Sequence, residues 1–199
     1  MSVSPAKKIE NICVYCGASA RVGDVYKNMA ARMGTLIAAS GYGLVYGGGK
    51  SGLMGIVADA VLAGGGPAIG IIPAMLRQRE VQHTGLTELV VVDSMHVRKQ
   101  MMVDRSDAFV ILPGGLGTLD EMFEGLTWKQ LGIHGKPVVL VNFNGYWDPV
   151  ITVMDRMTEE GFMRLEDRDM CIVVDTPEDV IVAIEKAPRE VIDPSSKWI

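Results

Sequence analysis

The chain has 199 residues, of which 48% are hydrophobic and 22% are charged, and its net charge is −5. The length predicts a single domain, the apolar share excludes a disordered chain, and the acidic balance argues against a nucleic-acid binder. Glycine is over-represented, with 23 residues, since its usual share is about 7% of a chain. These glycines follow no strict period, which excludes a collagen, so their positions need an explanation.

The first residues predict neither export nor membrane insertion. They contain no apolar core followed by a small-residue cleavage site, and no later run approaches the roughly 18 apolar residues of a membrane span. Three cysteines, an odd number, are typical of a reducing compartment, so we expect a cytoplasmic protein without membrane contact. Cys13 and Cys16 form a CxxC pair, but residues three apart in a strand point to opposite faces, which favours a structural role over a redox or zinc pair.

Strand and helix patterns alternate along the chain. In order they are strand 11–16, helix 24–40, strand 43–46, helix 52–63, strands 68–72 and 89–93, helix 95–105, strand 108–112, helix 117–131, strand 137–142, helix 147–160, strand 170–174 and helix 177–187. Several strands are continuous apolar runs, which are typical of parallel strands covered on both faces. The alternation predicts a single-domain, Rossmann-like α/β fold over residues 1–187, with an open parallel sheet of about seven strands and helices on both faces. Residues 188–199 show no periodicity, and we expect a loose C-terminal tail.

Two glycine clusters lie where a strand ends and a helix begins, at residues 47–52 and 114–117. In a parallel sheet these turns share the carboxyl edge, where ligands bind. Glycine allows close backbone approach, and the helix N-terminus behind each turn offers N–H groups to an anion. A third turn after the first strand contains Ser19, whose hydroxyl adds a donor.

The first cluster resembles two nucleotide-binding motifs without completing either. A P-loop needs a glycine where this chain has Leu44. Gly47, Gly49 and Gly52 satisfy G-x-G-x-x-G, but the acidic residue that binds ribose about 20 residues later is missing near residues 70–73. An NAD-linked oxidoreductase is therefore disfavoured, while glycines that only form tight turns remain an alternative.

Two helix starts carry charged residues beside these turns. Arg98 and Lys99 lie in the first turn of one helix, where cations oppose the helix dipole unless an anion binds; a solvated basic pair is the alternative. On the other helix Glu121, Glu124 and Trp128 lie opposite the apolar stripe. A solvated face is the ordinary interpretation, but the same side also holds Gly125 and Leu131, which suggests a homodimer interface with Glu121 in a cleft near it.

The residues 113–121, which read PGGLGTLDE, and the upstream MHVRK at 95–99 form a specific pair of motifs. With them the chain resembles the LONELY GUY family of cytokinin riboside 5′-monophosphate phosphoribohydrolases over about residues 10–187. Further similar segments are 14–19, 46–49, 52–55 and 128–134. The family has often been labelled lysine decarboxylase, a label that no residue here supports.

The resemblance implies hydrolysis of the N-glycosidic bond of adenosine 5′-monophosphate or its N6-prenyl derivative, giving the free base and ribose 5-phosphate. It implies Arg98 and Glu121 as the catalytic pair, no cofactor or metal, and a homodimer or larger homo-oligomer with the site near the interface. The residues expected to bind the nucleoside monophosphate are Ser19, Gly47, Gly48, Glu80, Met95, Lys99, Gly114, Gly115, Leu116, Gly117, Thr118 and Glu124. A non-catalytic nucleotide or cofactor carrier, as in the related molybdenum-cofactor carriers, is the alternative.

Overall fold

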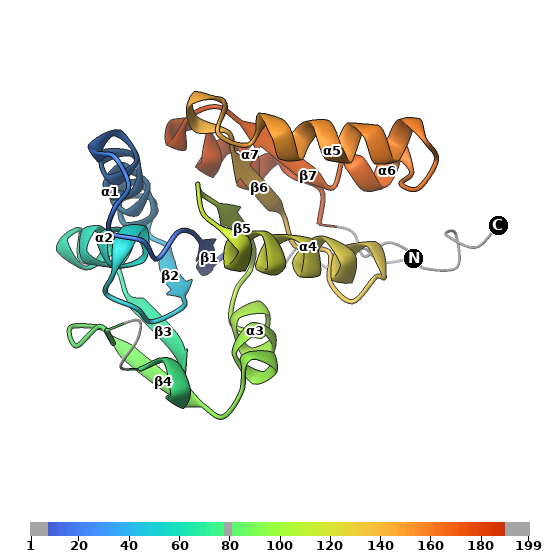
Figure 1. Ribbon diagram of the computed structural model, residues 1–199. Helices are drawn as coiled ribbons and strands as arrows, with labels where there is room; N and C mark the ends of the chain where they lie inside the picture. Colours follow the sequence, from blue (N-terminus) through green and yellow to red (C-terminus); the bar gives the residue numbers. More distant parts are fainter. Residues whose placement is uncertain (1–7, 78–80, 190–199) are drawn as a thin grey trace.

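The computed structural model describes residues 8–77 and 81–189 and contains one seven-stranded sheet. The strands are β1 (Asn11–Tyr15), β2 (Gly43–Tyr46), β3 (Ala68–Pro73), β4 (Glu88–Val92), β5 (Ala108–Ile111), β6 (Val138–Val141) and β7 (Cys171–Val174). Every pairing is parallel, and the strand order is β4-β3-β2-β1-β5-β6-β7 (Figure 1). The predicted α/β fold with about seven parallel strands is confirmed.

The described part of the chain has seven α-helices and three short 3₁₀ helices; all lie between strands except the last two, which follow β7. The α-helices are α1 (Asp24–Ala39), α2 (Gly52–Ala63), α3 (Met95–Asp104), α4 (Leu116–Gln130), α5 (Asp148–Glu159), α6 (Leu165–Arg168) and α7 (Val180–Lys186). The 3₁₀ helices are η1 (Ala74–Leu76), η2 (Phe143–Gly145) and η3 (Pro177–Asp179). The predicted helix 177–187 is therefore divided between η3 and α7.

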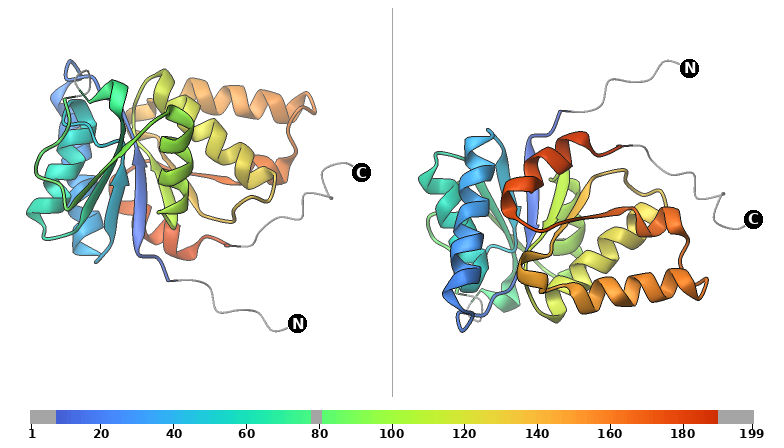
Figure 2. Two further views of the ribbon diagram at one scale, coloured as in Figure 1. Left: turned by 90° about the horizontal axis from the view of Figure 1, so that it is seen from below. Right: turned by 90° about the horizontal axis from the view of Figure 1, so that it is seen from above.

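Helices cover both faces of the sheet (Figure 2). On one face α1, α2 and α7 pack in a core that includes Met33, Val57 and Ile184. On the other face α3, α4 and α5 pack in a second core that includes Met102 and Met122. The buried apolar side chains of these helices pack against the sheet and contribute hydrophobic stabilisation.

The two cysteines of the CxxC pair lie on opposite faces of the sheet, as predicted for residues three apart in a strand. Cys13 belongs to the core that contains α4, whereas Cys16, just beyond the end of β1, belongs to the core that contains α1. Both are buried free thiols. Burial raises the pKa of each thiol, so both stay protonated at neutral pH.

The order in which strands join the sheet changes side at β1, while all strands stay parallel. From β1 the connections lead outward through β2 and β3 to β4, and then return to β5 on the other side of β1. The loops after β1 and β5 consequently diverge and leave a crevice at the carboxyl edge, the usual ligand site of such sheets.

Within residues 8–77 and 81–189, no helix has the length and apolar character needed to cross a bilayer. Most of the predicted tail, at 190–199, lies outside the described residues.

Candidate active site

A cavity of about 590 Å³ lies at this crevice. Its walls come from segments that follow six of the strands, from β1 to β6. Representative side chains are Ser19 after β1, Leu53 after β2, Leu76 after β3, Arg98 after β4, Glu121 after β5 and Tyr146 after β6. Residues from distant parts of the sequence thus meet at one edge of the sheet.

The turn after β5 forms one wall of the cavity through a very close approach of backbone. The Gly17 N–H donates to the Pro113 carbonyl at 3.1 Å. A Cβ added to Gly114 would lie 2.1 Å from the Thr118 hydroxyl oxygen, so only glycine fits there. Helix α4 starts directly after this turn, and its first N–H groups lack carbonyl partners within the helix. This wall can therefore bind an anion.

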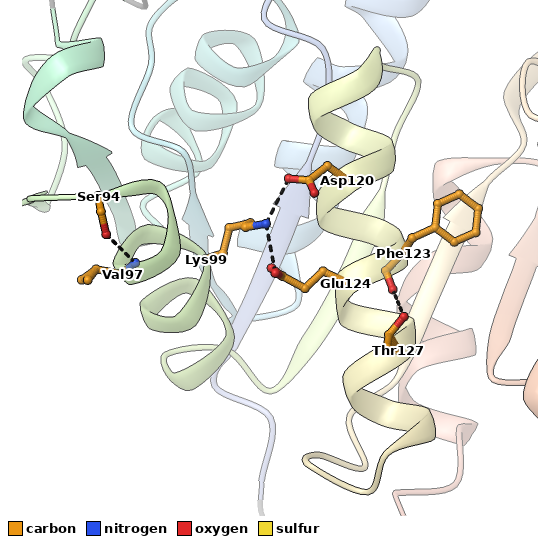
Figure 3. A network of polar contacts seen from close by, with 7 residues as sticks. All are labelled: Ser94, Val97, Lys99, Asp120, Phe123, Glu124 and Thr127. Carbon is orange, nitrogen blue, oxygen red and sulfur yellow. Dashed lines mark hydrogen bonds and ion pairs between the residues drawn. The ribbon is translucent and has the colours of Figure 1, made fainter. Parts of the chain in front are cut away.

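Arg98 is a buried cation at the cavity. It lies near the start of α3, where the Ser94 hydroxyl caps the helix by accepting from the Val97 N–H at 3.2 Å (Figure 3). Its guanidinium donates to the Gly47 carbonyl at 2.8 Å and to the Ile71 carbonyl at 3.1 Å. Because these carbonyls belong to β3 and to the end of β2, the sheet itself orients the charge.

Glu121 supplies a carboxylate in the same cavity, from the second turn of α4. Burial raises the pKa of the Cys16 thiol, and the negative charge of Glu121 raises it further. Burial also raises the pKa of Tyr15, followed by the charges of Cys13 and Glu121. The carboxylate of Glu121 therefore acts electrostatically on the end of β1, where the first wall of the cavity begins.

An ion-pair network joins the two helices that carry Arg98 and Glu121. The Lys99 ammonium lies 3.1 Å from Asp120 and 3.0 Å from Glu124, both on α4 (Figure 3). Burial lowers the pKa of Lys99, but its hydrogen bonds to the two carboxylates outweigh this effect and leave the pKa raised. Lys99 therefore stays charged and links α3 to α4.

Comparisons with known proteins agree with this architecture. The family model described as "Possible lysine decarboxylase" matches residues 54–184. The cytokinin riboside 5′-monophosphate phosphoribohydrolase LOG1 of Arabidopsis thaliana is 41% identical over 193 residues, covering 96% of this chain and 91% of that protein. The cytokinin riboside 5′-monophosphate phosphoribohydrolase of Rhodococcoides fascians is 45% identical over 176 residues, covering 88% of this chain and 89% of that protein. The chain belongs to the LONELY GUY (LOG) family.

A solved structure shares the fold of this LOG-family chain at low sequence identity. The molybdenum cofactor carrier protein of Chlamydomonas reinhardtii superimposes with a TM-score of 0.69 at 22% identity, covering 90% of this chain and 98% of that one. Such a likeness concerns the fold alone.

Most residues expected from the LOG motifs meet at the cavity. Those that line it are Ser19, Met95, Arg98, Gly114, Gly115, Gly117, Thr118 and Glu121. Five others belong to the surrounding described structure rather than to its lining: Gly47, Gly48, Lys99, Leu116 and Glu124. Glu80 lies outside the described residues.

The five outlying residues have other surroundings. Gly47 accepts from Arg98 through its carbonyl, and Gly48 has a φ of +75° and packs near Leu89. Lys99 and Glu124 pair with each other, and the Leu116 side chain is 86% exposed. These five residues are therefore neighbours of the cavity, and the N–H group of Leu116 lies in the first turn of α4.

The sequence patterns missed several lining residues, including Val22, Tyr26, Leu53, Met54, Leu76, Asp120 and Tyr146. The position of Tyr146 shortly after the predicted strand 137–142 was an available signal, because this places it at the same carboxyl edge as the glycine turns. Leu53 and Met54 lie in the similar segment 52–55, whereas Val22 and Leu76 lie in none of the motifs.

The face of α4 suggested for a homodimer is partly covered within the chain. Glu124 pairs with Lys99 of α3, and Gly125 is buried and accepts from the His134 ring at 3.1 Å. Trp128 packs partly against the core, while Leu131 just beyond the helix is exposed.

In the described part of the chain, no three His, Cys, Asp or Glu residues gather as a metal-binding group.

Proposed function

We propose that this chain hydrolyses the N-glycosidic bond of an adenosine 5′-monophosphate, with or without an N6-prenyl group, and releases the free base and ribose 5-phosphate. The names of its relatives in Arabidopsis thaliana and Rhodococcoides fascians support this reaction. The observation that carries it is that Arg98 and Glu121 line one cavity together with the Gly114 turn.

In this proposal the turn and the start of α4 bind the 5′-phosphate. The anion would meet backbone N–H groups and the positive end of the helix dipole, and the Thr118 hydroxyl adds a donor beside Gly114. Phosphate binding positions the ribose, so that nucleosides without a phosphate react more slowly.

Glu121 is proposed to act on the sugar. Breaking the bond to the base develops positive charge on the ribose ring, which a nearby carboxylate stabilises. The same carboxylate can accept a proton from the water that attacks the anomeric carbon; the base leaves with the bonding electrons and takes up one proton, so that one water is consumed.

Arg98 is proposed to orient the sugar and the departing base. The fork-like donors of its guanidinium suit oxygen and nitrogen acceptors. The bonds to Gly47 and Ile71 fix the group before substrate arrives, so little reorganisation is needed during the reaction.

The apolar lining of the cavity suits a base with an apolar substituent. Val22, Leu53, Met54 and Leu76 contribute to it, together with Tyr26. An N6-prenyl group buried there would gain hydrophobic stabilisation, although each methylene contributes only modestly to discrimination.

We further propose a cytoplasmic homodimer or larger homo-oligomer with the site near the interface. The exposed Leu131 next to Trp128, and the exposed Leu116 and Val97 at the starts of α4 and α3, are apolar side chains that a second copy would cover. Light scattering at micromolar protein tests this proposal, and a monomeric mass would refute it.

The reaction itself is tested by incubating the protein separately with AMP and with N6-isopentenyladenosine 5′-monophosphate. Chromatography should detect the free base in amounts equal to the ribose 5-phosphate formed. The ratio of the two rates gives the substrate preference. Binding of both nucleotides without base release over hours would instead identify a carrier.

A further inference from the structure

Tyr146 reaches across the edge of the sheet to the phosphate-binding turn. Its hydroxyl donates to the Gly114 carbonyl at 2.7 Å, and both residues line the cavity. We propose that Tyr146 is a positioning residue, which sets the orientation of the peptide between Gly114 and Gly115 and so prepares the turn for a phosphate. This inference rests on the proposed function, because that function supplies the phosphate.

The geometry of a peptide group makes the contact consequential. A trans peptide is planar, so the Gly114 carbonyl and the Gly115 N–H point in opposite directions. A bond that holds the carbonyl therefore also holds the N–H. The preceding peptide is held in the same way, because the Gly17 N–H donates to the Pro113 carbonyl at 3.1 Å. Two consecutive N–H groups are thus oriented before any ligand binds.

This peptide needs an external support because glycine lies on both of its sides. Glycine has no Cβ, so rotation of a peptide between two glycines meets little steric resistance. The surroundings of Gly115 leave it room, since an added Cβ there would meet no atom within 4 Å. The hydrogen bond from the Tyr146 hydroxyl therefore favours one orientation of this peptide, which side-chain sterics alone would not fix.

The loop that carries Tyr146 is itself well fixed. The Asn142 side chain accepts from the Trp147 N–H at 2.8 Å and donates to Asp148 at 2.8 Å. The Tyr146 ring packs edge-to-face on the buried Trp147, with ring centroids 4.8 Å apart, and on Tyr26, at 5.7 Å. These contacts deliver the hydroxyl to Gly114 with little remaining freedom.

The substitution Tyr146→Phe tests the proposal because it keeps the ring and removes only the hydroxyl. Isothermal titration calorimetry with ribose 5-phosphate and with adenine measures the two halves of the site without any turnover. We expect the dissociation constant for ribose 5-phosphate to rise about three- to tenfold, the usual effect of one lost hydrogen bond. The affinity for adenine should stay unchanged.

Tyr42→Phe is the matched control. The Tyr42 hydroxyl also makes a 2.7 Å hydrogen bond, to Glu185, but this bond joins the loop between α1 and β2 to α7 and lies outside the cavity lining. The control variant should bind ribose 5-phosphate like the wild type. Thermal unfolding of both variants shows whether they fold.

Two results would overturn the proposal: equal affinity of wild type and Tyr146→Phe for ribose 5-phosphate, or an equal loss of affinity for adenine. A wild type that does not bind ribose 5-phosphate would overturn it as well. If the wild type binds ribose 5-phosphate but releases no base from AMP, the proposed reaction fails while the role of Tyr146 is still decided by the calorimetry.

Discussion

The ammonium of Lys99 lies 3.0 Å from the carboxylate of Glu124, and this pair joins α3 to α4 directly behind the two residues assigned to catalysis. Arg98 precedes Lys99 in the chain, and Glu121 lies one helical turn before Glu124. The side chains of the pair are 11% and 23% exposed, so solvent screens their attraction only in part. The contact therefore helps to hold the helix that carries Arg98 against the helix that carries Glu121.

Replacing Lys99 by methionine should destabilise the protein and reduce turnover together. The substitution leaves the mostly buried Glu124 without its partner, which we expect to cost about 2 kcal/mol, between the values for exposed and fully buried pairs. Lys99→Arg keeps the charge and should recover at least half of this loss. Urea unfolding and the rate of base release measure the two effects.

A double-mutant cycle of Lys99→Met with Glu124→Gln separates the pair from the rest of the network. We expect a coupling free energy of about 1 kcal/mol, because the second substitution removes the carboxylate that the first leaves unpaired. Additive effects of the two substitutions, within about 0.3 kcal/mol, would show that the contact does not hold the helices.

Two neighbouring glycines of the turn should respond differently to alanine. In Gly114→Ala the new Cβ would lie 2.1 Å from the Thr118 hydroxyl oxygen and 3.0 Å from the Gly17 nitrogen, so the turn must shift. We expect a loss of about 1–3 kcal/mol of unfolding free energy, as for other overpacked sites. Gly115→Ala meets open space and should cost less than about 1 kcal/mol. Equal unfolding midpoints of the two variants in urea would contradict the geometry.

His134 should make the stability of the protein depend on pH. Its ring is buried, with Nε2 donating to the Gly125 carbonyl and Nδ1 accepting from the Lys136 N–H at 3.2 Å. Burial, together with the charge of Lys136, lowers the pKa of His134 from 6.5 to about 4. Below pH 6.5 the unfolded chain therefore binds a proton that the native state does not accept until about pH 4.

The stabilising contribution of neutral His134 is consequently present above about pH 6.5 and is lost as the pH falls towards 4. The slope should approach about 1.4 kcal/mol per pH unit. Urea unfolding at several pH values measures it, and His134→Gln should flatten the dependence. The exposed His96 provides the control, since His96→Gln should leave the slope unchanged. A wild-type slope that survives in His134→Gln would assign the dependence to other groups.

The sequence patterns predicted the strands and the longer helices well and missed most of the short helices. The bounds of β2 and α2 agree with the predicted segments 43–46 and 52–63 at both ends. Helix α6 was not predicted, because four residues are too few to show a helical period. Strand β1 ends one residue before the predicted end at Cys16, since that residue already belongs to the turn at the cavity.

The site was predictable only where its residues follow a strand or carry a motif. The Gly114 turn, Arg98 and Glu121 meet these conditions, and all line the cavity. Lys99 lies beside Arg98 in the sequence, but its pairing with α4 depends on how two helices pack, which no local pattern contains. Tyr146 contacts Gly114 across 32 positions of the chain, and only the tertiary structure shows that contact.

The central claim is that the Glu121 carboxylate acts on the ribose during cleavage of the N-glycosidic bond. Glu121→Gln keeps the size of the side chain and removes its charge. The decisive measurement is the single-turnover rate of adenine release from AMP, with the AMP dissociation constant of the same protein determined by calorimetry. We predict a rate at least about 100-fold lower with nearly unchanged AMP binding, whereas release at close to the wild-type rate would contradict this assignment.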